Sequence, residues 1–177
     1  MGCWGITALE SDNGLDAVRC VRYNLPADGQ LDLGEMLERL KKDRWNAPCD
    51  VKLGCAHTSP MALAEIVVKY LDGDPGSLDY DEEWAAEDNK FRSITSFTAS
   101  RASLRELRDY LADTLKYARI RAERQIKAGG WFDPKDWDGW QKHMEGLIHR
   151  LDGVLALEGS TLELAHPLAP TVPELTM

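Results

Sequence analysis

The sequence predicts a single, all-α (mainly helical) domain. We expect an irregular multi-helix bundle built on a long C-terminal antiparallel helical hairpin, with at most one minor pair of short strands. Apolar residues recur every three or four positions in several stretches, which is the helical period. Ser, Asp and Pro stand at the starts of these stretches, as they do at helix N-termini. A Gly-Gly pair, Gly129-Gly130, separates the two longest stretches and predicts a tight turn.

Length and composition fit one folded domain. The chain has 177 residues, of which 44% are hydrophobic and 29% are charged. Its formal net charge of −9 argues against binding to nucleic acid or to an anionic membrane, because both depend on Lys and Arg. No apolar run approaches the ~18 residues that span a bilayer. We expect a cytoplasmic protein with reduced cysteines, since these do not cluster and no secretory signal precedes them.

The first half of the chain carries clear helix-start signals. Ser11 or Asp12 can cap a first helix, and a turn that contains Pro and Gly ends it after residue 25. The pair Asp32 and Glu35 has capping-box spacing, which predicts a second helix over about Leu33 to Arg44.

A third helix is predicted from Ser59-Pro60 to Leu71. Proline at the first helical position loses no needed hydrogen bond. Apolar residues occupy most sides of this helix, so we expect it to be the most buried of the three. The irregular stretch before it has room for a brief strand at Val51–Leu53.

The last two apolar stretches form the predicted hairpin. The capping-box pair Ser103 and Glu106 starts the first helix, which ends at the Gly-Gly pair. Asp133-Pro134 starts the second helix, which runs to about Gly159. A turn this short makes the two helices antiparallel neighbours. Their apolar stripes comprise Leu104, Leu107, Leu111, Leu115, Ala118, Ala122 and Ile126, then Trp137, Trp140, Met144, Leu147, Leu151, Val154 and Leu155.

The single domain, 1–177, divides into four parts. They are the N-terminal helices (1–71), an acidic connecting segment (72–99), the long hairpin (100–159) and an extended tail that contains proline (160–177).

Three glycines in the last helix, Gly139, Gly146 and Gly153, lie seven residues apart and opposite its apolar stripe. Each costs a helix ~1 kcal/mol relative to alanine. One reading is a second close-packed helix contact, which makes a homodimer through this face a hypothesis. The other reading is tolerated surface glycine in a helix that its opposite face holds in place.

No pattern predicts catalytic residues, a metal site or a cofactor. Cys49, Cys55 and His57 lie close together, but no second close pair completes a zinc motif. The stretch from Asp72 to Glu83 has acids at some EF-hand positions, yet its fifth and sixth residues lack the acid and the glycine that this loop needs. Nucleophile-elbow and phosphate-loop motifs are absent from the sequence. We therefore expect a protein that is not an enzyme.

An acidic run follows the third helix. Residues 72–88 include eight Asp and Glu and no Lys or Arg, whereas the next long helix has a basic edge. The run can dock on that edge, with modest and salt-sensitive energy. Alternatively, it faces outward and binds a basic protein partner. The candidate partner-binding residues are Asp74, Asp79, Asp81, Glu82, Glu83 and Glu87.

The tryptophans Trp131, Trp137 and Trp140 gather near the hairpin turn. They favour an aromatic plug at the end of the bundle, because buried aromatic rings contribute large apolar area. The alternative is an aromatic pocket, in which case the protein is a small enzyme or a ligand-binding module.

The N-terminal residues form a recognisable motif. The chain opens Met-Gly-Cys-Trp-Gly and continues with Glu10, Asp12 and Asp16. This opening resembles a poorly characterised bacterial domain family with a Met-Gly-x-Trp-Gly…Glu-x-Asp…Asp signature, although Leu9 stands where an aromatic residue is usual. The resemblance covers roughly the first 20 residues. Some members are considered candidate toxin-immunity proteins, so the resemblance implies that role. The signature residues are Gly2, Trp4, Gly5, Glu10, Asp12 and Asp16.

The residues of this motif also have a structural interpretation. Glycines on both sides of Trp4 allow a tight turn that buries the indole. Acids in the first turn of a helix favour its positive dipole end. Together, charge and motif predict a non-enzymatic, acidic interaction protein, and an immunity protein is the specific hypothesis.

Overall fold

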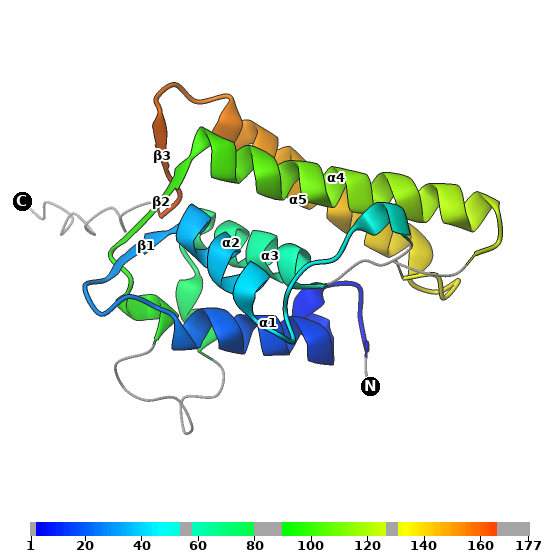
Figure 1. The fold of residues 1–177 in the computed structure, drawn as a ribbon, viewed down its shortest axis with the longest axis horizontal. Coiled ribbons are helices and arrows are strands. Elements are labelled where there is room, and N and C mark those ends of the chain that lie inside the picture. The colour runs from blue at the N-terminus through cyan, green and yellow to red at the C-terminus, as the bar shows by residue number, and fades with distance from the viewer. Residues whose placement is uncertain (1–2, 54–57, 80–89, 127–130, 166–177) are drawn as a thin grey trace, which may run out of the picture.

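The computed structural model describes residues 3–53, 58–79, 90–126 and 131–165. It is mainly helical, with a small sheet at one end of the molecule (Figure 1). The helices are α1 (Asp12–Tyr23), α2 (Leu33–Lys42), α3 (Ser59–Leu71), α4 (Arg101–Glu123) and α5 (Trp137–Leu155). Short 3-10 turns are η1 (Ala8–Glu10), η2 (Val51–Leu53), η3 (Pro75–Leu78) and η4 (Phe91–Ser93). The predicted helical class is confirmed, and no helix of the described residues is long and apolar enough to cross a membrane.

The helix starts of the first half lie where the sequence predicts them. The Ser11 hydroxyl accepts a hydrogen bond from the Gly14 N–H (3.0 Å), and Asp32 accepts one from the Glu35 N–H (3.0 Å). These caps satisfy amides that have no partner inside the helix. Every residue from Ser59 to Val67 is buried, so α3 has the buried character expected of it. It contacts α1, α4, α5 and η1, and it therefore lies at the centre of the core.

The structure has a sheet of three short strands, whereas the sequence predicts at most one pair. β1 (Gln30–Asp32) pairs in parallel with β2 (Ser96–Ser100), and β2 pairs antiparallel with β3 (Thr161–Glu163). The sheet therefore joins segments far apart in the sequence. The strand expected at Val51–Leu53 is wrong: that stretch is η2. Asp50 causes the turn, because its carboxylate accepts from the Lys52 N–H at 2.9 Å and its carbonyl accepts from the Leu53 N–H at 3.1 Å.

α4 and α5 lie side by side and run in opposite directions (Figure 1). Arg101, at the start of α4, donates to the carbonyl of Leu155 (2.7 Å), the last residue of α5, and to that of Gly159 (2.6 Å) beyond the helix. Towards the other end, Arg119 of α4 donates to Gln141 of α5 at 2.8 Å. The Gly129-Gly130 turn lies outside the described residues.

Both ends of α4 differ from the expectation. Ser100, and not Ser103, is the N-cap, because β2 runs directly into the helix and the Ser100 hydroxyl accepts from the Ser103 N–H at 3.1 Å. The helix ends before the glycine pair. Gln125 adopts the left-handed conformation (φ 59°), and the Ile126 N–H donates back to the Arg121 carbonyl at 2.8 Å, as in a Schellman motif. Ile126 is 52% exposed and leaves the apolar stripe.

Candidate functional site

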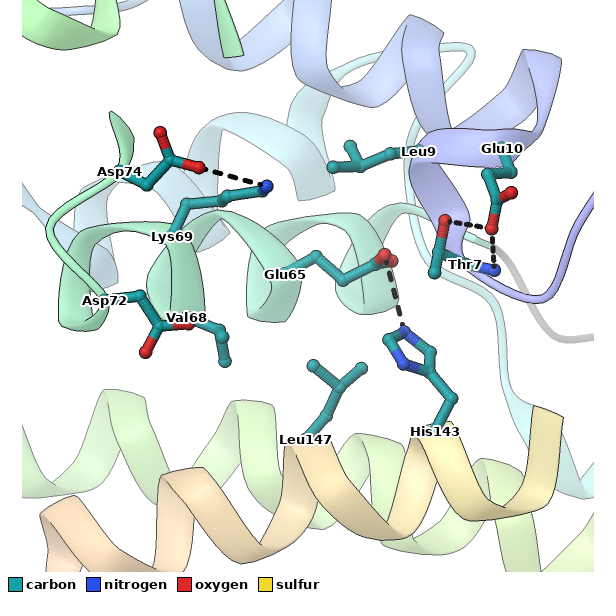
Figure 2. Close-up of a pocket in the computed structure, with 10 residues that line it drawn as sticks. All are labelled: Thr7, Leu9, Glu10, Glu65, Val68, Lys69, Asp72, Asp74, His143 and Leu147. Carbon is teal, nitrogen blue, oxygen red and sulfur yellow. Dashed lines mark hydrogen bonds and ion pairs between the residues drawn. The ribbon is translucent and has the colours of Figure 1, made fainter. Parts of the chain in front are cut away.

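A pocket of about 430 Å³ opens between η1, α3 and α5 (Figure 2). Its lining residues come from three distant parts of the chain: Thr7, Leu9, Glu10, Glu65, Val68, Lys69, Asp72, Asp74, His143 and Leu147. Four of these side chains are carboxylates and one is a lysine. The pocket is therefore acidic, and a concave site with converging polar groups is the default candidate for binding.

Glu65 is the buried carboxylate of this pocket. It is 6% exposed, and it stands on α3 among apolar neighbours. Its Oε2 accepts a hydrogen bond from the Ala8 N–H at 2.7 Å. That amide is one of the open donors at the start of η1, so Glu65 ties η1 to α3. A buried charge is costly without such a partner.

The second oxygen of Glu65 faces α5. Oε1 lies 3.4 Å from Nε2 of His143, and Figure 2 shows the two side chains pointing toward each other. This distance is long for a hydrogen bond, and His143 Nε2 is buried without a hydrogen-bond partner among the described residues. The inner end of the pocket thus brings a carboxylate oxygen and an unsatisfied imidazole nitrogen together.

The N-terminal motif builds the opposite wall. Glu10 Oε1 accepts from the Thr7 N–H (3.2 Å) and from the Thr7 hydroxyl (2.9 Å), as in a capping box. A Cβ on Gly5 would lie 2.2 Å from the Glu10 carboxyl carbon, so glycine at this position leaves room for the carboxylate. The signature residues Gly5 and Glu10 therefore act as a unit, and Glu10 lines the pocket.

Ion pairs with Arg and Lys neutralise the two rim carboxylates, whereas the inner carboxylate of Glu65 lies beside His143. Asp72 lies 2.7 Å from an Arg150 nitrogen, and Asp74 lies 3.5 Å from Lys69 Nζ. In the part of the chain that the structure describes, neither Glu10 nor Glu65 has a Lys or Arg within ion-pair distance. Inside the pocket, therefore, no Lys or Arg of the described residues neutralises Glu10 or Glu65.

The candidate partner-binding residues lie in different environments. Asp74 is at the pocket rim. Asp79 is 3% exposed, and its carboxylate accepts from the Phe91 N–H at 2.8 Å and the Arg92 N–H at 3.2 Å, so it caps η4 inside the protein. Burial removes Asp79 from any docking surface in this structure. The remaining candidates lie outside the described residues: Asp81, Glu82, Glu83 and Glu87.

The basic edge of α4 pairs mainly with α5. Arg108 lies 2.9 Å from Asp152, and Arg119 pairs with Glu145. Two described carboxylates of the acidic run pair elsewhere: Asp72 with Arg150 of α5, and Asp74 with Lys69 of α3.

The motif residues outside the pocket lie at the surface. Trp4 is 57% exposed, so the expected burial of its indole is wrong. The Trp131 indole N–H donates to the Gly5 carbonyl at 2.9 Å, and the motif is therefore held from outside by another tryptophan. Asp12 and Asp16 are exposed in the first turns of α1, and Gly2 lies outside the described residues.

The tryptophans near the hairpin turn form a stack. Trp140 is fully buried, with Trp131 and Trp137 stacked on it at 5.6 Å each, and Phe132 stacks on Trp137 at 4.7 Å. The rings pack directly on one another, as the interpretation of an aromatic plug expects.

The three spaced glycines do not share one open face. Gly139 packs against Ile6 of the same chain, where an added Cβ would lie 3.4 Å from the nearest side-chain atom. An added Cβ on Gly146 or Gly153 would meet nothing within 4 Å. Only the latter two are free to contact a second molecule.

Cys3 and Cys20 are the free cysteines among the described residues, and Cys3 is exposed. Cys49 is disulfide-bonded, so the expectation of reduced cysteines is wrong at this position. Burial, and then the nearby Asp43 carboxylate, raise the pKa of Cys20 to about 11, which keeps it a thiol near neutral pH. The described residues also contain no group of three or more His, Cys, Asp or Glu side chains that could hold a metal ion.

No family model, curated protein or solved structure matches this chain. The likeness of the N-terminal motif to a bacterial family therefore stays a prediction.

Sequence reasoning missed most of the pocket. It singled out Glu10 and Asp74, but not Glu65, Lys69 or His143. One signal was present in the sequence. Glu65 is the acidic residue of the most apolar helix of the first half, and a buried carboxylate is costly unless a hydrogen bond or an ion pair stabilises it. The approach of His143 depends on helix packing and leaves no local pattern.

Proposed function

We propose that this protein is a non-enzymatic interaction protein that binds a basic protein partner, and that its role is toxin immunity in a bacterial cytoplasm. The observation that carries the proposal is the acidic pocket, whose inner carboxylates Glu10 and Glu65 have no Lys or Arg partner among the described residues. Complementary charge steers association and rejects wrong partners. The α4–α5 pair serves as the scaffold that presents His143 and Leu147 to this pocket, and we propose that these helices form one hairpin.

The N-terminal motif supports the same role. In the pocket wall, Gly5 makes room for Glu10, so the residues that resemble the bacterial family also shape the candidate site. The acidic residues Asp81, Glu82, Glu83 and Glu87 belong to the same proposal as an outer docking segment.

The test uses a toxin encoded beside the gene for this protein. Co-expression of the chain should restore growth of cells that produce the toxin. Surface plasmon resonance should show an association rate that falls as salt rises. Glu10→Lys and Asp74→Lys should slow association, whereas the exposed Glu35→Lys on α2 is the matched control. A deletion strain that grows normally beside its neighbours' toxins, with no protein partner recovered, would overturn the proposal.

A second candidate function is a small enzyme or ligand-binding module. The contact between Glu65 and His143 in a pocket favours it, because a carboxylate beside an imidazole is a common acid–base arrangement. This candidate places the site at Glu65 and His143, whereas the sequence pattern places it near Trp131, Trp137 and Trp140. Turnover of a substrate that Glu65→Gln abolishes without loss of folding would favour the enzyme. If Glu65→Gln binds the protein partner as tightly as the wild type, the pocket does not contribute to that interaction.

A further inference from the structure

We propose that the pocket binds a guanidinium group, presented as an arginine side chain of a protein. That a protein supplies the arginine rests on the proposed function. That the pocket binds a guanidinium group is argued from the pocket residues alone. The ligand class follows from three features: unbalanced charge, an excess of hydrogen-bond acceptors and an apolar wall.

Charge is the first feature. Asp72 and Asp74 are already paired with Arg150 and Lys69. Glu10 is held by neutral donors of Thr7, and Glu65 is held by the Ala8 amide. Backbone and hydroxyl donors orient these carboxylates without cancelling their charge. A cation that enters the pocket meets two positioned carboxylates, which is the condition for strong, charge-assisted hydrogen bonds.

Acceptors are the second feature. Glu65 Oε1 makes no hydrogen bond among the described residues, and it faces the unsatisfied Nε2 of His143 at 3.4 Å. Glu65 is more than nine-tenths buried, and its carboxylate points into the pocket in Figure 2. A cationic donor that reaches Oε1 makes a charge-assisted hydrogen bond with the carboxylate. Guanidinium has five N–H donors in a fixed plane and no acceptor, so it matches this end of the pocket.

The apolar wall is the third feature. Leu9, Val68 and Leu147 line the pocket together with the charged groups. Such a surface accommodates the methylene stem of a long basic side chain while its head group reaches the carboxylates. Arginine fits better than lysine, because the planar fork of guanidinium can bind a carboxylate through two parallel hydrogen bonds.

The experiment titrates small capped amino acids into the full chain. N-acetyl-arginine amide is the probe, and calorimetry together with the NMR signals of the His143 ring reports binding. N-acetyl-citrulline amide has the same shape without charge, and N-acetyl-lysine amide has charge without the fork. We expect the arginine probe to bind at least about tenfold tighter than either comparator, since hydrogen bonds with an ionised partner are roughly twice as strong as neutral ones.

Protein variants locate the site. Glu65→Gln keeps an oxygen for the Ala8 amide but removes the charge, and it should weaken probe binding by about tenfold or more. Gly5→Ala should weaken binding without changing any charge, because its Cβ displaces the Glu10 carboxylate. Glu35→Gln, on the exposed face of α2, is the matched control and should leave binding unchanged.

The outcomes separate the two proposals. Equal binding of the arginine and citrulline probes, or of the arginine and lysine probes, overturns the guanidinium site, as does wild-type affinity in Glu65→Gln. If free arginine binds tenfold tighter than the capped probe, the protein source is overturned. If the arginine probe binds but no basic protein is found to bind this chain, the guanidinium site is supported and the proposed interaction function is refuted. If a protein partner binds the wild type and Glu65→Gln equally well and the probe does not bind, the interaction function is supported and the guanidinium site is refuted.

Discussion

Along α5, the face that packs on α3 and α4 and the face that points to solvent carry different residues. Trp140, Met144 and Leu151 on the inner face are fully buried. Gly146 and Gly153 on the outer face have open space where a side chain would stand. Packing against neighbours fixes the residue type only on the inner side. The outer glycines persist because tertiary contacts of the other face hold the helix.

The largest expected effect is on the inner face. Trp140→Ala should lower the free energy of unfolding by ~3–5 kcal/mol, because it removes the central ring of the aromatic stack and leaves a cavity. Urea denaturation measures the loss. Trp45→Ala is the control, since Trp45 is 75% exposed and its removal should cost less than ~1 kcal/mol. Equal losses would mean that Trp140 is not part of the core.

A smaller loss is expected where α4 caps the end of α5. Arg101→Ala removes a donor to the carbonyl of Leu155, one of the last carbonyls of α5, and a donor to the Gly159 carbonyl beyond the helix. We expect destabilisation by ~1–2 kcal/mol, because hydrogen bonds to charged groups contribute more than neutral ones. The exposed Arg105→Ala should change the melting temperature little. If Arg101→Ala and Arg105→Ala have the same melting temperature, the hydrogen bonds of Arg101 do not stabilise the end of α5.

The outer face should respond in the opposite direction. Gly146→Ala and Gly153→Ala should each stabilise the protein by ~1 kcal/mol or somewhat less, since nothing meets the added Cβ and alanine is the better helix former. Thermal denaturation measures the gain. A homodimer closely packed through these glycines predicts the reverse, a loss that depends on protein concentration. Sedimentation equilibrium then shows whether the mass changes.

The smallest expected effect concerns an exposed ion pair between the two long helices. Asp152→Asn removes the contact with Arg108, in which the Asp152 side chain is 47% exposed. We expect a loss of ~1 kcal/mol or less that disappears at high salt. A salt-independent loss would show that the residue supports the helix pair through packing and not through charge.

Local signals in the sequence predicted much of α1 to α3. Ser11, Asp32 and Ser59-Pro60 mark their starts, because capping depends on residues within one turn of the helix. The start of α4 was predicted three residues late, since Ser100 lies at the end of a strand whose partners come from residues 30–32 and 161–163. Its end was also predicted late, because Gln125 adopts a left-handed conformation usually associated with glycine.

By itself, the sequence determined the helical class, the apolar stripes and the acidic balance of the chain. Each depends on the spacing or the number of residues along the chain. Only the tertiary structure decided that Trp4 is exposed, that Asp79 is buried and that Glu65 meets His143 across two helices. Burial and contact depend on which faces pack together. The pocket therefore arises from packing between η1, α3 and α5, which lie far apart in the sequence.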